Sequence, residues 1–183
     1  MKTQILKHVV AAFFTTCVLS LPLQAQQDAA TLLDQLAAAS EVDAARLDRE
    51  LSLIWDNSGS AAMNLLLKRG RDALEAEETG QAIEHLTALT DHAPGFAEGW
   101  HMRATAFYRA GLYGPALDDL QRALALNPQN YNAIFGLGVM LREFGDLPRA
   151  AEAFEQVLAL HPHHENAKTA REQLQQRGIG RTL

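Results

Sequence analysis

Cysteine is almost absent from the chain of 183 residues, which contains only Cys17. The residues before it, Phe14-Thr15-Thr16, match a lipobox poorly, so we do not expect an acylated cysteine. Beyond the first 25 residues no thiol is left to form a disulfide, so packing must supply the stability. Basic residues are also few, with 16 against 22 acidic residues. This balance argues against a nucleic-acid binder and against adhesion to anionic lipid.

Catalytic motifs are absent from the sequence as well. There is no glycine-rich phosphate loop, no HExxH and no GxSxG nucleophile motif. Acidic residues occur in two runs, Asp118-Asp119 and Glu75, Glu77 and Glu78, whose helical spacing predicts solvated faces rather than acid–base pairs. The sequence therefore predicts a protein that is not an enzyme, with no catalytic residue and no cofactor.

One histidine cluster leaves an alternative open. His161, His163 and His164 flank Pro162. A metal site needs three or four converging ligands, whereas histidine is also favoured at a solvated helix C-terminus by the helix dipole. We expect that second role and no metal site. A metal-binding or enzymatic role centred on residues 161–164 is the alternative, which a zinc titration would test.

The first 25 residues have the pattern of a secretory signal peptide. Lys2 and Lys7 are followed by a mainly apolar, uncharged run from Val9 to Leu23, and Ala25 is a small residue suited to signal peptidase. This run is shorter than the ~20 residues that span a bilayer. We expect cleavage after about Ala25 and a periplasmic chain with no membrane insertion. Losing the two lysines leaves 14 basic and 22 acidic residues, a net charge of −8.

A period of 34 residues runs through the middle of the chain. Four sets of residues recur in register, namely Pro94, Pro128 and Pro162; Ala82, Ala116 and Ala150; Gly70, Ala104 and Gly138; and Leu66, Trp100 and Ile134. A small residue inside a helix is favoured where another helix packs close against it. Apolar residues at spacings of three, four and seven predict amphipathic helices. The period predicts stacked helix pairs, with a proline closing each second helix.

This pattern resembles the tetratricopeptide repeat, whose signature is a Trp, then Leu-Gly, a Tyr, and later Ala, Phe and a closing Pro. The middle repeat carries it as Trp100, Ala104, Phe107, Ala116, Leu120, Ala123 and Pro128, and the third as Ile134, Leu137, Gly138, Leu141, Ala150, Phe154 and Pro162. The first repeat matches the signature less well, and Arg69 and Arg103 occupy positions where the family prefers Leu. The resemblance implies an all-α fold, a right-handed superhelical α-solenoid of three helix pairs at about 63–96, 97–130 and 131–164.

Helical segments flank the three predicted repeats. Residues 31–39 and 41–55 are predicted to be helices, with a capping box at Ser40 and Asp43, and Ser60 is expected to cap the first repeat. Because the end of a repeat array exposes an apolar face, we interpret residues 26–60 as an N-terminal helical cap. Residues 165–183 are predicted to form a C-terminal capping helix and a tail.

The resemblance also implies a binding surface, because the first helix of each pair lines a concave face in this family. The predicted partner-binding residues are Asn64, Lys68, Arg71, Glu98, His101, Thr105, Tyr108, Arg109, Asn132, Phe135 and Arg142. Arginine and aromatic side chains dominate interface energies, and three of these arginines could hold a carboxylate.

We therefore predict a protein–protein interaction module, an adaptor or scaffold in the bacterial cell envelope, that binds a protein or peptide. A periplasmic chaperone or assembly factor for exported proteins is the alternative. Self-association through the same grooves is a further possibility.

Overall fold

The computed structural model describes residues 21–176, with side chains from residue 28 onward. This part of the chain forms nine α-helices and no strand, which confirms the predicted all-α class. Residues 1–20 of the predicted signal peptide, with Cys17, lie outside the described residues, as does the tail after Gln176. Between residues 21 and 176, no helix combines the length and the hydrophobicity needed to cross a membrane.

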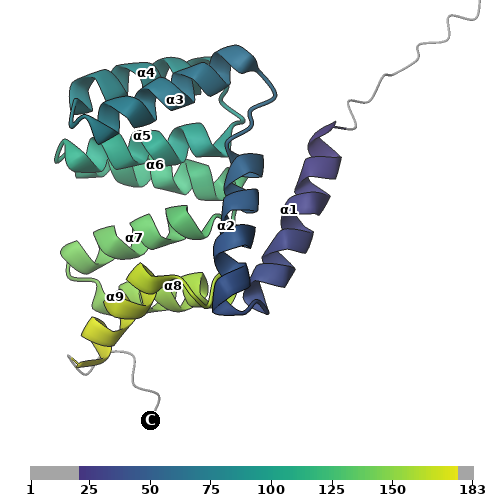
Figure 1. Cartoon of the computed structure of the whole chain (residues 1–183). Helices are drawn as coiled ribbons and strands as arrows, with labels where there is room; N and C mark the ends of the chain where they lie inside the picture. Colours follow the sequence, from purple (N-terminus) through teal and green to yellow (C-terminus); the bar gives the residue numbers. More distant parts are fainter. Residues whose placement is uncertain (1–20, 177–183) are drawn as a thin grey trace, which may run out of the picture.

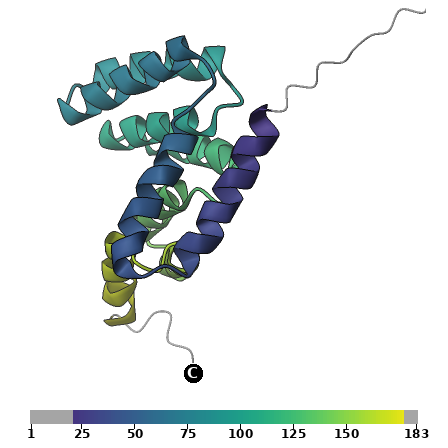
Figure 2. The same ribbon diagram turned by 45° about the vertical axis from the view of Figure 1, so that its right-hand side comes forward.

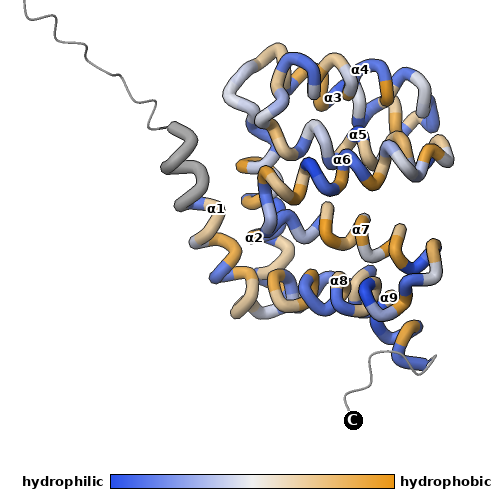
Figure 3. Tube along the Cα trace, turned by 180° about the vertical axis from the view of Figure 1, so that it is seen from behind, coloured by the Kyte–Doolittle hydropathy of each residue, from blue (hydrophilic) through white to orange (hydrophobic). Residues whose placement is uncertain are grey.

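Six helices form three antiparallel pairs that stack in sequence order (Figure 1). They are α3 (Ala61–Glu75), α4 (Thr79–His92), α5 (Ala97–Arg109), α6 (Tyr113–Leu126), α7 (Tyr131–Glu143) and α8 (Leu147–Leu160). Pro94, Pro128 and Pro162 each follow the last residue of a second helix by two positions, as the 34-residue period predicts. Figure 3 shows hydrophobic residues interspersed with hydrophilic ones along these helices, so each buries one side.

The small residues of the repeat lie where neighbouring helices come close. A Cβ atom added to Gly138 would lie 2.7 Å from Cε1 of Phe154, and one added to Gly70 would lie 2.5 Å from Cγ of Leu86. Both of these large side chains are fully buried in the core. Each glycine lowers the helix propensity, but the absence of a side chain allows the two helices of a pair to pack closely.

The first two helices, α1 (Leu21–Ala37) and α2 (Glu41–Trp55), form an antiparallel pair that we call the N-terminal pair. The hydroxyl of Ser40 accepts a hydrogen bond from the backbone N–H of Asp43, so this residue caps α2 as predicted. The pair does not extend the stack beyond α3 and α4. Instead, α2 runs across the stack on the side of α3, α5 and α7 (Figures 1 and 2). Its apolar residues share one core cluster with the third repeat, which includes Leu36, Leu47, Leu51, Tyr131, Ile134 and Val157.

The outer face of the first repeat is polar, which explains why the N-terminal pair does not cover it. Arg103 and Asp119 face the preceding repeat, and Arg69 and His85 occupy the same phases one repeat earlier. These two residues, with Asp72 and Gln81, line the open groove between α3 and α4. A polar surface needs no cover, whereas the apolar residues Tyr131, Ile134 and Val157 do. The N-terminal pair therefore lies on the third repeat rather than at the end of the array.

The last helix of the described chain, α9 (Glu165–Gln176), packs on α8. Ala167, Ala170 and Leu174 are buried on its inner side, as the sequence pattern indicates. Its first turn is capped by His164, whose Nδ1 atom accepts a hydrogen bond from the backbone N–H of Ala167 over 3.1 Å.

Candidate partner-binding site

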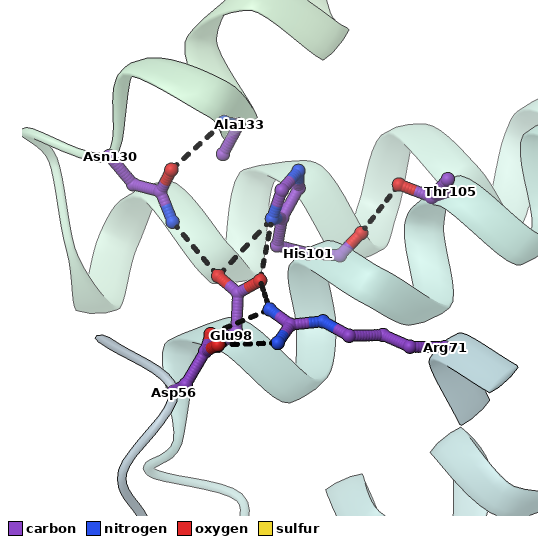
Figure 4. Close-up of polar contacts among 7 residues, drawn as sticks. All are labelled: Asp56, Arg71, Glu98, His101, Thr105, Asn130 and Ala133. Atoms are coloured by element: carbon purple, nitrogen blue, oxygen red, sulfur yellow. Dashed lines mark hydrogen bonds and ion pairs between the residues drawn. The ribbon is translucent and has the colours of Figure 1, made fainter. Parts of the chain in front are cut away.

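Three of the predicted partner-binding residues, Arg71, Glu98 and His101, belong to a network of polar contacts that spans three repeats (Figure 4). Glu98 is buried in the first turn of α5 and accepts a hydrogen bond from Arg71 over 2.7 Å. Arg71 also makes two hydrogen bonds, of 2.5 and 2.6 Å, to the carboxylate of Asp56 after α2. Nδ1 of His101 lies 3.2 Å from Glu98, and Nδ2 of Asn130 donates to it over 3.3 Å.

This network keeps Glu98 ionised. Burial by itself raises the pKa of the carboxyl, but the neighbouring His101 and Arg71 outweigh it, so the pKa lies below its ordinary value. Asn130 extends the network to the third repeat, because its side chain also accepts the backbone N–H of Ala133 and caps α7. Arg71 and Glu98 are thus committed to contacts within the chain. Their placement gives them a structural role and leaves little of Glu98 for a partner.

A second polar contact of this kind was missed in the sequence. The guanidinium of Arg103 makes two hydrogen bonds to Asp119, of 2.7 and 2.9 Å, and a third to Thr90. Its Cζ atom lies 4.8 Å from the centroid of the Trp100 ring. The prediction that the Asp118-Asp119 run is a solvated face is therefore wrong for Asp119, which is buried, and holds for Asp118. The signal was Arg103 at a position where an apolar residue is expected, since a buried cation needs a carboxylate nearby.

Other predicted residues lie in an apolar hollow between α5 and α7 with a volume of about 180 Å³. Its walls are His101, Ala104, Thr105, Tyr108, Leu120, Phe135, Gly136, Val139 and Met140. Phe135 forms one end, where its ring also contacts Phe154 and His164. The helices α5 and α7 are the first helices of their pairs, and α2 crosses the stack on the side of these first helices (Figure 1).

Two further predicted arginines, Arg109 and Arg142, lie in the last turns of α5 and α7. Arg109 donates to the carbonyl of Leu74 in the last turn of α3, and Arg142 lies 3.5 Å from Oε1 of Gln173. Neither forms an ion pair with a carboxylate in residues 28–176. Their charges are therefore not neutralised within the described chain.

The remaining predicted residues do not join the hollow. Asn64 holds the turn before α3, where its side chain accepts the backbone N–H of Ser58 over 2.9 Å. Lys68 forms an exposed ion pair with Asp72 one turn later on α3. Asn132 lies half-buried in the first turn of α7. The structure thus brings together His101, Thr105, Tyr108 and Phe135, whereas Arg109 and Arg142 lie in the last turns of α5 and α7 and do not line the hollow.

Comparison with known proteins agrees with this architecture. A family model described as tetratricopeptide repeat matches residues 67–116 and 101–165, which together span more than half of the chain. The chain belongs to the tetratricopeptide repeat (TPR) family. It is 30% identical over 144 residues to a TPR repeat-containing protein of Rhizobium etli, an alignment that covers 78% of this chain and 69% of that protein.

Solved TPR structures share the fold. The first TPR of Spaghetti (RPAP3), bound to the HSP90 peptide SRMEEVD, superimposes with a TM-score of 0.61 at 24% identity, covering 64% of this chain and 94% of that one. The TPR2B domain of yeast Sti1, in its pHsp70 complex, superimposes with a TM-score of 0.59 at 16% identity, covering 64% of this chain and 99% of that one. At these identities the likeness shows the fold alone.

The histidine cluster of this TPR chain holds the N-terminal pair in place. His161 is buried with Nε2 3.8 Å from Oδ1 of Asp48 on α2, and the same oxygen accepts the hydroxyl of Tyr131 over 2.6 Å. His163 donates to the carbonyl of Ala39 in the turn between α1 and α2. The expectation of solvated histidines at a helix end is therefore wrong for His161. Within the described residues, no group of three or more histidine, cysteine or acidic side chains could hold a metal ion.

The buried histidines predict a loss of stability in weak acid. Burial lowers the pKa of both His161 and His164 from the ordinary value of 6.5, and Asp48 opposes it only in part. The folded chain therefore binds fewer protons than the unfolded chain below pH 6.5. The free energy of unfolding should be constant above about pH 7 and fall by about 1–2 kcal/mol toward pH 5.5. Urea unfolding at several pH values measures this.

Two variants make this pH test specific. A His161→Leu/His164→Asn variant should flatten the pH dependence, since asparagine can still cap α9 and leucine does not titrate. His92→Gln, at an exposed position, should keep the wild-type slope. A wild-type stability that is unchanged or higher at pH 5.5 would contradict the neutral state of these histidines.

Proposed function

We propose that this protein is an exported interaction module of the bacterial envelope that binds a partner peptide in the hollow between α5 and α7. The TPR domain of Spaghetti binds an HSP90 peptide and the TPR2B domain of yeast Sti1 forms a pHsp70 complex, which supports a protein-interaction role for this fold. The hollow is the observation that carries the proposal. It is an apolar concavity on the face lined by the first helices, and it accepts a bulky apolar side chain of the partner.

The surroundings of the hollow favour an acidic partner. Arg109 and Arg142 lie in the last turns of α5 and α7, the helices on either side of the hollow, and have no carboxylate partner in the described chain, although the chain as a whole has a net charge of −6. A carboxylate of the partner would form charge-assisted hydrogen bonds with these guanidinium groups. Arg71, which the sequence grouped with them, is already paired with Asp56 and Glu98 and takes no part.

Export rests on the N-terminal sequence. The basic residues Lys2 and Lys7, the apolar run and Ala25 support cleavage by signal peptidase and a periplasmic location. N-terminal sequencing of the chain from an envelope fraction should begin near Gln26. A chain recovered from the cytoplasm and beginning at Met1 would contradict export.

A binding experiment tests the hollow without knowledge of the natural partner. The probe is a library of random dodecapeptides displayed on phage and selected on the wild-type chain. Val139→Glu places a charge in the apolar hollow, and Thr105→Trp fills it with a large ring. Both variants should weaken the binding of selected peptides at least tenfold, the effect of removing one interface anchor.

The control for this experiment is Val42→Glu, at a highly exposed position on α2 outside the hollow. It should bind the selected peptides as the wild type does. Circular dichroism and thermal unfolding check that all three variants are folded. If the selected peptides bind Val139→Glu and Thr105→Trp with wild-type affinity, or if no peptide is enriched, the proposed function is wrong.

A further inference from the structure

Three large apolar side chains lie exposed at the turns within the second and third repeats. Leu112, Tyr113 and Phe144 are 47%, 42% and 53% exposed. The ring of Tyr113 meets that of Phe144 edge-on, with 5.7 Å between their centroids, and meets that of Tyr108 at 5.8 Å. We call Tyr108, Tyr113 and Phe144 the aromatic edge. Tyr108 lies in the last turn of α5, Tyr113 is the first residue of α6 and Phe144 follows the last residue of α7, so all three lie at the same end of these helices.

The aromatic edge is continuous with the hollow. Tyr108 lines the hollow on one side and contacts Tyr113 on the other. An apolar surface therefore runs from Phe135 and Val139 through Tyr108 to the ring of Phe144. Aromatic side chains that are held by neighbouring rings lose little freedom on binding and are frequent interface anchors.

At the opposite end, near the start of α7, the N-terminal pair packs on the stack. There α2 crosses the stack, with Trp55 packed on Tyr131 at 5.0 Å between ring centroids. Next to it, Asp56, Arg71 and Glu98 are joined by ion pairs. Toward the start of α5 and α7, a segment seated in the hollow would meet this packed and ion-paired region. Toward the turns at the other end of these helices, it would meet the aromatic edge.

The charges near the aromatic edge indicate the chemistry of the partner. Arg142 lies near Tyr108, and its charge acts on the hydroxyl of that residue. The carboxylate in this region, Glu143, accepts the hydroxyl of Tyr108 over 2.5 Å. Burial and this hydrogen bond raise the pKa of Tyr108 to about 12, so the hydroxyl stays a donor at neutral pH. Arg142 is then left to pair with a carboxylate from outside.

We propose that the partner segment leaves the hollow over Tyr108, packs a second apolar side chain on Tyr113 and Phe144, and places an acidic side chain against Arg142. The partner is thus a peptide with two bulky apolar residues and a carboxylate near the second. The inference rests on the proposed function and adds the direction of the bound segment, its second anchor and its charge.

The same dodecapeptide library tests this inference. Peptides selected on the wild type should be enriched in a pair of bulky apolar residues with aspartate or glutamate beside one of them. A Tyr113→Ser/Phe144→Ser variant should bind these peptides about tenfold more weakly. The matched control is Val42→Ser/Leu53→Ser on α2, where the side chains are 86% and 72% exposed, and it should bind as the wild type does.

Arg142→Gln tests the charge. It should weaken binding several-fold at low salt and make the affinity less dependent on salt, because one exposed ion pair is lost. Equal binding by Arg142→Gln and the wild type at low and high salt would overturn the acidic requirement.

The outcomes separate the two proposals. If Val139→Glu abolishes binding while Tyr113→Ser/Phe144→Ser does not affect it, the hollow is the site and the aromatic edge is not part of it. If neither variant matters, both proposals are wrong. Analytical ultracentrifugation of the wild type and of Tyr113→Ser/Phe144→Ser tests whether the chain self-associates through the aromatic edge. If only the wild type forms a dimer, the aromatic edge binds a second copy of the chain, and the proposal that it binds a peptide is wrong.

Discussion

Replacing Arg71 by methionine should lower the free energy of unfolding by about 3–5 kcal/mol at pH 7. Arg71 is the guanidinium that pairs with Glu98, which is buried in the first turn of α5. Removing it leaves that carboxylate with only His101 and Asn130 as partners. An uncompensated buried charge is far more costly than the loss of an exposed pair. Urea unfolding followed by circular dichroism measures the difference.

A control on the same helix makes this prediction specific. Lys68→Met removes the exposed pair with Asp72, whose side chains are 69% and 55% exposed, and should change stability by less than about 0.5 kcal/mol. Adding Glu98→Gln to Arg71→Met should restore part of the loss, because the unpaired charge is then gone. Equal effects of Arg71→Met and Lys68→Met would show that the network contributes no more than a surface pair.

The same network should also make the free energy of unfolding depend on pH in the acid range. In the wild type the pKa of Glu98 lies below its ordinary value, so its stabilising contribution is present above about pH 4.5 and is lost as the pH falls through the folded-state pKa. Arg71 is one of the two side chains that lower the pKa of Glu98, so its removal should leave this pKa higher than in the wild type. The difference in stability between Arg71→Met and the wild type should therefore shrink as the pH falls through the pKa of Glu98 in the variant. It should stop changing below the lower pKa of the wild type, where Glu98 is protonated in both folded proteins.

Two alanine substitutions in α7 should have opposite effects on stability. Gly138→Ala adds a Cβ atom 2.7 Å from Cε1 of the fully buried Phe154, so it should destabilise the chain by about 1–3 kcal/mol despite the better helix propensity of alanine. Gly136→Ala meets Leu120 at an ordinary 3.5 Å. It should stabilise the chain by about 0.5–1 kcal/mol, because only the propensity changes.

Thermal and urea unfolding of the two variants measures this difference. The two sites lie on one helix two residues apart, so overall helix propensity and length are matched. If both substitutions stabilise the chain, the helices α7 and α8 do not approach as closely as the structure has them. A Gly138→Ala/Phe154→Leu variant should then be compared with Phe154→Leu alone, since the smaller side chain leaves room for the Cβ atom and should remove much of the penalty.

The repeats could be predicted from the sequence because their determinants are local and periodic. Pro94, Pro128 and Pro162 each lie just after the second helix of a pair. Gly70 and Gly138 occupy the same position in their repeats and mark where two helices pack closely. The position of the N-terminal pair has no such signal. Its contacts join Asp48 to Tyr131, 83 residues apart, and Ala39 to His163, 124 residues apart. No period connects these residues, so the sequence indicated two helices and not the repeat that they pack on.

The candidate site was predictable only in part for a related reason. Thr105, Tyr108 and Phe135 follow from their phase on α5 and α7, and these residues do line the hollow. The helical phase of Arg71 likewise predicts an exposed side chain. In the structure Arg71 is instead bound by Asp56, which lies outside the repeats, and by Glu98 of the second repeat. The aromatic edge was missed because Tyr113 and Phe144 lie beside the turns, where the helical phase no longer predicts exposure.

The most direct test of the account is an NMR map of the wild-type chain with one selected dodecapeptide. If the hollow between α5 and α7 is the binding site, the largest shifts should fall on His101, Thr105, Tyr108, Phe135 and Val139 and extend to Tyr113 and Phe144. Residues of α4 and the exposed face of α2 should be unaffected. Shifts concentrated on α4, α6 and α8, or on the N-terminal pair, would contradict the assignment of the partner to this face.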